Sequence, residues 1–252
     1  MKLIAPDYYK EFQCIAGACQ HTCCIGWEVD IDDESLEKFR AHDDILAHID
    51  VEGTPHFSLD EREKCPFLNG DNLCDMILRH GEDILCQICR DHPRFRSYWA
   101  DRTEIGLGLV CEEAGRLILG RREPMKLEVI SDDGEICEEP EDERWLTELR
   151  DGLLGQITDD GPRARLREYL IYRHLPDALY DGRVDERIAF VERSFDEIIT
   201  VWEQTDGSLE SLVDVARRWS YDVEYDEDEL ERRIAGGSVT GFEPPSNFAH
   251  AK

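Results

Sequence analysis

The stretch "FQCIAGACQHTCCIGW", residues 12–27, places Cys14, Cys19, Cys23 and Cys24 within eleven residues. Nine of the ten cysteines of the chain lie between residues 14 and 111. The N-terminal segment has no apolar region of a signal peptide, and no apolar run approaches the length of a membrane span. We therefore expect a cytoplasmic protein, in which clustered cysteines bind metal or carry out chemistry more often than they form disulfides.

Three interpretations of the cysteines are open. A single cysteine is usually a small buried hydrophobe, but this density argues against that for the whole set. Zinc sites use closely spaced pairs such as Cys86-x2-Cys89, whereas Cys65 and Cys74 are separated by eight residues. The whole set would exceed the four ligands of one tetrahedral ion, while two iron–sulfur clusters would use eight of its thiolates. Sites built only from thiolates suit iron–sulfur clusters or zinc and exclude hard cations.

The adjacent pair Cys23-Cys24 restricts these interpretations further. Neighbouring side chains of an extended segment point to opposite faces, so either each thiol serves a different centre or one of them packs. The spacing differs from the common radical S-adenosylmethionine signature C-x3-C-x2-C, because Gly26 stands where the third cysteine would be. A Rossmann-type methyltransferase is also unsupported, since no G-x-G-x-x-G follows a predicted strand.

The chain is strongly acidic, with a formal net charge of −29 and only six lysines against 23 arginines. Binding to nucleic acid or to an anionic membrane surface requires clustered Lys and Arg, so this balance disfavours both. Abundant Asp and Glu with few Lys are typical of proteins that work in concentrated salt. We expect a halophilic source, the alternative being an ordinary acidic protein in which charge serves solubility.

Raising the salt concentration from dilute buffer into the molar range is expected to raise the melting temperature. The repulsion between crowded carboxylates is then screened over roughly 3 Å at 1 M salt. Thermal melts across a sodium chloride series measure this effect. A flat or falling trend would mean that the acidity serves solubility only.

The pattern predicts a mainly α protein with small β-hairpins, in which a cysteine-rich, metal-binding N-terminal half packs on a helical C-terminal half. Residues 32–49 are predicted to form one helix capped by Asp32 or Asp33, and residues 103–120 a further helical stretch. A turn at residues 69–71 should bring Cys65 and Cys74 together. The predicted division is a cysteine-cluster region over 1–125, a connector over 126–142, a helical region over 143–237 and a flexible tail over 238–252.

Six segments together resemble one known family, the flagellin lysine-N-methylases, which belong with the wider YkgJ-type cysteine-cluster proteins that chelate zinc or iron. The resemblance covers roughly residues 3–120 and 165–235. The segments are "PDYYKEFQCIAGACQHTCCIGWEVDID", "CPFLNGDNLC", "CRDHPR", "LVCEEAGRLIL", "YLIYRHLPDALYDGRV" and "DVARRWSYDVEYDEDELERRI".

The resemblance implies transfer of a methyl group from S-adenosylmethionine to lysine ε-amines of a flagellin-like protein. It also implies an iron–sulfur cluster, with 4Fe–4S as the expected type and zinc as the alternative. Cys86 and Cys137 fall outside the family pattern, so neither is expected to be a ligand of the main site. The metal ligands carried over by position are Cys14, Cys19, Cys23, Cys24, Cys65, Cys74, Cys89 and Cys111.

Two further residues are candidates for binding the methyl donor. Arg94 could pair with the carboxylate of S-adenosylmethionine, although such an arginine is more often part of a structural ion pair. Trp27 could stack on the adenine, although a tryptophan beside a cysteine cluster more often shields it. The sequence does not single out a catalytic base. The alternative from another class is a non-catalytic protein that binds iron or zinc or serves as a redox partner.

Overall fold

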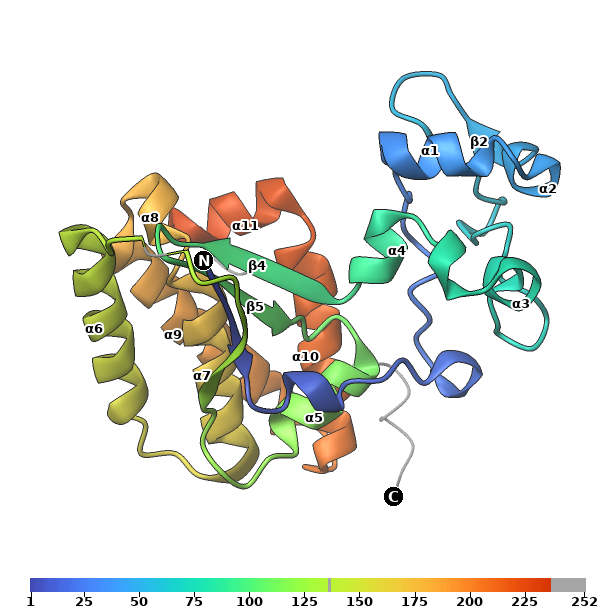
Figure 1. Cartoon of the computed structure of the whole chain (residues 1–252). Helices are drawn as coiled ribbons and strands as arrows, with labels where there is room; N and C mark the ends of the chain where they lie inside the picture. Colours follow the sequence, from blue (N-terminus) through green and yellow to red (C-terminus); the bar gives the residue numbers. More distant parts are fainter. Residues whose placement is uncertain (136, 237–252) are drawn as a thin grey trace. The chain divides into compact units, whose positions relative to one another are not determined.

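The computed structural model describes residues 1–135 and 137–236, which form two compact units (Figure 1). The first, here called the sheet unit, contains residues 1–12 and the chain from residue 93 onward. The second, the cysteine unit, contains residues 13–92. This division differs from the predicted one, in which residues 1–125 form a single region. The predicted tail over 238–252 lies outside the described residues.

A four-stranded sheet in the order β4-β5-β1-β6 explains the division. Strand β1 (Lys2–Pro6) runs parallel to β5 (Arg102–Leu107) and antiparallel to β6 (Leu127–Asp132). Strand β4 (Arg94–Tyr98) forms an antiparallel hairpin with β5. The first residues of the chain are therefore held between strands that come a hundred residues later. The predicted connector also contributes β6, so it belongs to the sheet.

The predicted helix over residues 103–120 is wrong in its first half, which forms β5. Only the part after Cys111 is helical, as α5 (Glu112–Leu119). Gly106 of β5 lies opposite Phe95 of β4, and a Cβ at Gly106 would meet the Phe95 ring at 2.3 Å. The glycine thus makes room for a ring that lies across the strand pair. The structure thus contains short hairpins, as the sequence predicts, together with a small mixed sheet that the sequence does not predict.

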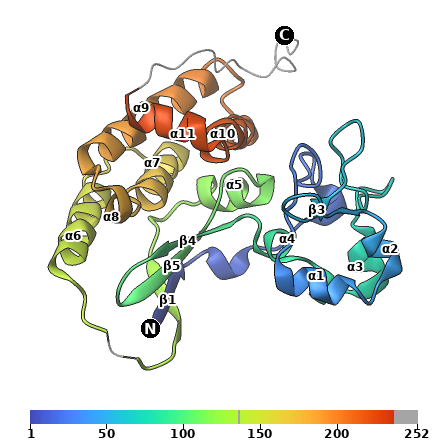
Figure 2. The ribbon, with the colours of Figure 1, turned by 90° about the horizontal axis from the view of Figure 1, so that it is seen from above.

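The helices of the sheet unit gather on one side of its strands (Figure 2). Tyr172 of α7 donates a hydrogen bond from its hydroxyl to the carbonyl oxygen of Ile105 on β5, at 3.2 Å. The core between the helices contains large, fully buried side chains such as Trp219 and Phe190. The predicted helices of the C-terminal half are confirmed, and Pro162 lies in the first turn of its helix as expected. The helices and short helical turns not yet given are η1 (Tyr9–Glu11), α6 (Glu141–Gly155), α7 (Gly161–His174), α8 (Ala178–Asp181), α9 (Val184–Trp202), α10 (Leu209–Glu224) and α11 (Glu227–Ile234).

The cysteine unit is built from short elements around a small core. The predicted helix over 32–49 is interrupted and forms two helices, and Asp32 caps the first of them by accepting a hydrogen bond from Ser35 N at 2.9 Å. The core contains the aromatic rings of Phe39, Phe57 and Phe67. The ring of Phe57 is tilted against that of Phe39 and stands edge-on to that of Phe67. Its elements are η2 (Ala16–Ala18), α1 (Asp33–Phe39), α2 (Asp43–Leu46), β2 (Ile49–Asp50), β3 (His56–Phe57), α3 (Asp75–His80), η3 (Glu82–Ile84) and α4 (Gln87–Asp91). A unit of this size with such short elements usually requires additional stabilisation, for example by a metal.

Within the ranges that the structure describes, none of the helices combines the length and the apolar character needed to cross a bilayer.

Candidate functional site

Backbone pairing within the cysteine unit joins the first cysteine stretch to the segment that carries Cys65. The Cys65 amide donates to the carbonyl oxygen of Cys24 at 2.8 Å, and Ile25 forms an antiparallel bridge with Lys64. These main-chain hydrogen bonds place the Cys23-Cys24 pair beside Cys65, although Cys24 and Cys65 are 41 positions apart in the sequence.

The predicted turn at residues 69–71 is confirmed. The Asn69 side chain accepts hydrogen bonds from the amides of Asp71 and Leu73, at 2.9 and 3.0 Å, and Leu68 forms a bridge with Cys74. Asn72 adopts a left-handed conformation with φ 61°, which asparagine tolerates better than most residues. Its side-chain amide donates to the carbonyl oxygen of Cys19 at 3.0 Å, which ties the turn to the first cysteine stretch.

Two cysteines of the cysteine unit stand directly before short helices. Cys74 precedes α3 and Cys86 precedes α4. The carboxylate of Asp32, which caps α1, also accepts a hydrogen bond from the amide of Gln87 at 2.9 Å. Although burial raises the Asp32 pKa, this bond and those from Ser35 lower it to about 2. One ionised side chain therefore ties α1 to the start of the helix that carries Cys89.

Hydrogen bonds between thiols change the acidity of two cysteine pairs. A hydrogen bond from Cys23 lowers the pKa of Cys24 to about 6, and a hydrogen bond from Cys89 lowers the pKa of Cys86 to about 7. The same contact, together with burial, raises the pKa of Cys89. Burial also raises the pKa of Cys65 to about 11. In each pair, one thiol therefore loses its proton at a lower pH than an ordinary cysteine does.

Hydrogen bonds within two pairs, and electrostatic interactions between these pairs and two further cysteines, relate six thiols of the cysteine unit, here called the thiol group. The charge of Cys24 raises the pKa of Cys65, Cys74 and Cys89. The charges of Cys74 and Cys86 also raise the pKa of Cys65. Folding thus gathers thiols from four separate parts of the sequence. The members of the thiol group are Cys23, Cys24, Cys65, Cys74, Cys86 and Cys89. Five of them are among the predicted ligands.

Cys86, which the family pattern does not include, is a member of the thiol group. Its side chain is fully buried, and it shares a hydrogen bond with Cys89. The C-x2-C spacing of this pair was the sequence signal that could have included it. Cys137, the other cysteine outside the family pattern, lies in the sheet unit.

The remaining predicted ligands are distributed over both units. Cys14 is exposed, and its sulfur accepts a hydrogen bond from Ala16 N at 3.4 Å. Cys19 is partly buried in the cysteine unit. Cys111 belongs to the sheet unit, where it stands immediately before α5.

The two residues predicted to bind the methyl donor also lie in different units. Arg94 begins β4, donates from Nε to the Tyr9 hydroxyl at 2.9 Å, and has its guanidinium 5.3 Å from the centre of the Phe12 ring. Trp27 lies in the cysteine unit, with its ring edge-on to His92 at a centroid distance of 6.2 Å. Neither lines the small pocket between α6, α7 and α9, whose walls are five aliphatic side chains and Glu192.

A buried polar network lies between α7 and α10 of the sheet unit. Glu224, whose side chain is 1% exposed, accepts hydrogen bonds from the Tyr169 hydroxyl at 2.9 Å and from Ser220. His174 Nε2 lies 2.9 Å from the same carboxylate, and Arg173 Nε lies 3.9 Å from it. Burial raises the Glu224 pKa, but His174, Arg173 and Ser220 lower it overall. The network therefore ties α7 to α10 through one buried carboxylate.

Acidification is expected to destabilise the sheet unit through this network. Burial lowers the pKa of His174 below its usual 6.5, so the unfolded chain binds its proton more readily. The stability from His174 is therefore present above pH 6.5 and lost as the pH falls below it, and that from Glu224 is lost below 4.5. Through His174, the free energy of unfolding should change by at most about 1.4 kcal/mol per pH unit. Melts of the wild type and His174→Gln between pH 7 and 5 measure it, and equal slopes in the two proteins would contradict the assignment.

The donor chemistry of the thiol group fits a soft metal. Six sulfurs, two of them with lowered pKa, match the ligands of zinc or of an iron–sulfur cluster. Hard cations such as Mg²⁺ prefer oxygen ligands, which this group does not supply. The arrangement is that of a cysteine-cluster unit joined to a helical, sheet-containing unit.

Comparison with proteins of known function relates the chain at a distance to enzymes that methylate lysine. It is 26% identical over 136 residues to the lysine-N-methylases of Salmonella typhimurium (strain LT2) and Salmonella choleraesuis, covering 48% of this chain and 33% of theirs. It is 26% identical over 134 residues to the flagellar biosynthetic protein FliU of Salmonella muenchen, covering 79% of that protein. The chain thus spans about a third of the length of the two methylases. No family model matches the chain, and no solved structure matches it.

Proposed function

We propose that this chain binds a metal centre through its thiol group and methylates lysine ε-amines of a protein, using S-adenosylmethionine as methyl donor. The observation that carries the proposal is the gathering of six thiols in the cysteine unit. The similarity to lysine-N-methylases supports the methyl-transfer part.

The thiol group has more sulfurs than one centre needs. A 4Fe–4S cluster takes four thiolates, and a structural zinc ion also takes four. The first candidates are the five cysteines common to the family pattern and to the thiol group, which are Cys23, Cys24, Cys65, Cys74 and Cys89. Cys86 adds a buried sixth sulfur beside Cys89. When bound, such a centre supplies free energy of folding and, in the case of iron, a one-electron redox couple.

Arg94 remains the candidate for the carboxylate of the methyl donor. Tyr9 and Phe12 flank its guanidinium, with ring centres at 5.7 and 5.3 Å, and they fix the position of the side chain. A planar guanidinium pairs with a carboxylate through two parallel hydrogen bonds, which an ammonium group does not reproduce. Trp27 is the candidate for stacking on the adenine.

The acidic surface suits a substrate that presents lysine. A net charge of −29 attracts cationic side chains at low salt and steers them toward the protein. The ammonium must lose its proton before its nitrogen attacks the methyl group on sulfur. A nearby carboxylate or desolvation of the lysine would achieve this. A flagellin-like filament protein is the proposed substrate.

The iron, sulfide and zinc content of anaerobically purified protein tests the metal centre. Isothermal titration of this protein with S-adenosylmethionine then tests donor binding. Arg94→Lys should weaken binding, whereas Arg96→Lys, an exposed neighbour on the same strand, should not. Mass increase on lysines of filament proteins reports methyl transfer. If the metal is present but the donor does not bind, the methylase proposal is wrong, and the protein is a metal carrier or redox partner.

Replacing Cys86 is expected to lower the metal content of the protein. Cys86→Ser removes a buried sulfur that contacts Cys89, whereas the matched Cys137→Ser variant changes a cysteine of the sheet unit. Metal analysis of both variants, purified side by side, measures the difference. Equal and full metal content in both would mean that Cys86 only packs in the core, as its place outside the family pattern predicts.

A further inference from the structure

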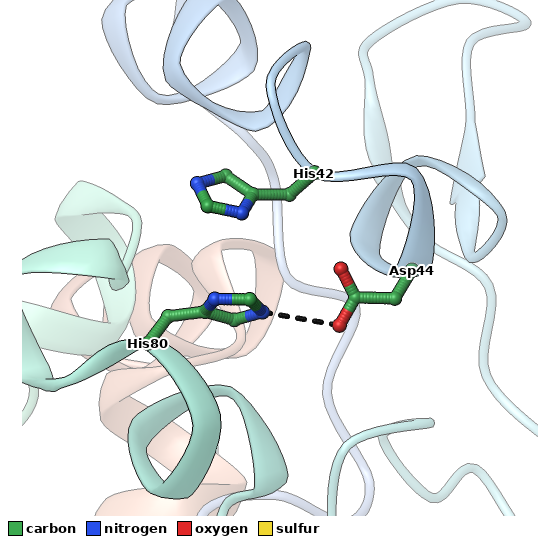
Figure 3. Close-up of side chains that lie close together, drawn as sticks. All are labelled: His42, Asp44 and His80. Atoms are coloured by element: carbon green, nitrogen blue, oxygen red, sulfur yellow. Dashed lines mark hydrogen bonds and ion pairs between the residues drawn. The ribbon is translucent and has the colours of Figure 1, made fainter.

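Three side chains of the cysteine unit that the thiol group does not use converge on one point (Figure 3). They are His42, Asp44 and His80, and their ligand atoms all lie within 4.8 Å of one another. The two imidazole rings lie edge to face with their centroids 4.4 Å apart, and the Asp44 carboxylate points toward His80. His80 Nε2 and Asp44 Oδ2 are 3.0 Å apart.

The local backbone places these side chains. His42 is the residue before α2, where the interruption of the predicted long helix turns the chain, and Asp44 lies in the first turn of α2. His80 is the last residue of α3, which ends at Gly81 with φ 84°. The group therefore joins the start of one short helix to the end of another, 38 positions apart in the sequence.

We propose that His42, Asp44 and His80 form a second metal site, for a divalent transition ion such as zinc. Two imidazole nitrogens and one carboxylate oxygen suit Zn²⁺, Ni²⁺ or Fe²⁺, and differ from the sulfur ligands of the thiol group. Three protein ligands leave room for water in a zinc site. His80 and Asp44 are 21% and 40% exposed, so solvent reaches the group. This site does not depend on the proposed methyl transfer.

Arg79 is the positive neighbour with which a metal would compete. Its Nη1 lies 3.5 Å from Asp44 Oδ2, while its Nη2 lies closer to Asp75 Oδ2, at 2.8 Å. A bound cation would replace the long contact to Arg79 and leave the short one to Asp75 in place.

Anaerobic titration of the full-length protein with Co²⁺ tests the site. Cobalt bound to thiolates gives an intense sulfur charge-transfer band, whereas cobalt bound to imidazole and carboxylate does not. The wild type should therefore bind one further Co²⁺ after this band has reached its maximum. His42→Ala and Asp44→Asn should each weaken that last binding step by roughly tenfold or more, with the band unchanged. Even loss of partners in the outer shell of a metal site costs about 10–100-fold in affinity.

His56→Ala is the matched control. Its side chain is 22% exposed and lies 3.8 Å from the carboxylate of Glu28, in the same unit, but with no second imidazole in that contact. This variant should retain the last binding step. The Asp44 side chain is 40% exposed and Asn has nearly the same shape, so Asp44→Asn is expected to keep the fold even if the loss of His42 disturbs α2. Retention of the last step in Asp44→Asn, or an equal loss in His56→Ala, would overturn the proposal.

Discussion

Cys24→Ala is expected to abolish metal binding by the thiol group and to unfold the cysteine unit. The Cys24 thiol interacts with Cys23, Cys65, Cys74 and Cys89, so its removal breaks the group at its most connected member. In small zinc domains, binding of the metal contributes about 10–16 kcal/mol, which is folding free energy. The small aromatic core of this unit is expected not to replace that contribution. Metal analysis and hydrogen exchange over residues 13–92 measure the two effects.

The matched control for this prediction is Cys137→Ala, which removes a thiol from the sheet unit. It should keep its metal and its pattern of hydrogen exchange. Amides of the sheet unit should also remain protected in Cys24→Ala, because that unit has its own core. Unchanged metal content in Cys24→Ala would contradict the assignment of the thiol group.

Glu224→Ala is expected to destabilise the sheet unit by about 3–5 kcal/mol, the usual cost of removing one partner of a buried ionic group. The carboxylate receives hydrogen bonds from Tyr169 and Ser220 and lies against His174 and Arg173. Its removal leaves these donors buried without their acceptor. Denaturant unfolding, followed by the fluorescence of the buried Trp219, measures the loss.

Two further variants define the cause of that loss. Glu224→Gln keeps the shape and one acceptor oxygen but removes the charge. Its free energy of unfolding should therefore lie between those of the wild type and Glu224→Ala. Glu148→Ala replaces an exposed glutamate of α6 and should change the stability by at most about 0.5 kcal/mol. A loss below about 1 kcal/mol in Glu224→Ala would show that the network is not a major source of stability.

The elements that the sequence predicts well are those fixed by local patterns. The apolar stripe of α9, the cap at Asp32 and the turn at Asn69 all depend on residues within a few positions of one another. The clustering of Cys65 and Cys74 follows directly from that turn. These features needed no knowledge of the rest of the chain.

The features that the sequence does not predict depend on pairing between distant segments. Strand β1 pairs with β5 across about a hundred residues, and nothing in five residues of β1 specifies that partner. The same limit applies to the site. His42 and His80 come together only because the predicted helix over 32–49 breaks before α2.

The position of β1 between β5 and β6 has a consequence for the order in which the molecule assembles. During synthesis, β1 leaves the ribosome first, but its two neighbours in the sheet follow only after the whole cysteine unit has been made. The cysteine unit is thus an insertion whose two ends meet where the Arg94 guanidinium covers the Phe12 ring. Residues 13–92 can therefore fold, and bind the metal proposed for the thiol group, before β1 pairs with its partner strands. A shortened gene that joins residue 12 to residue 93 through a brief linker would encode the sheet unit as a continuous domain.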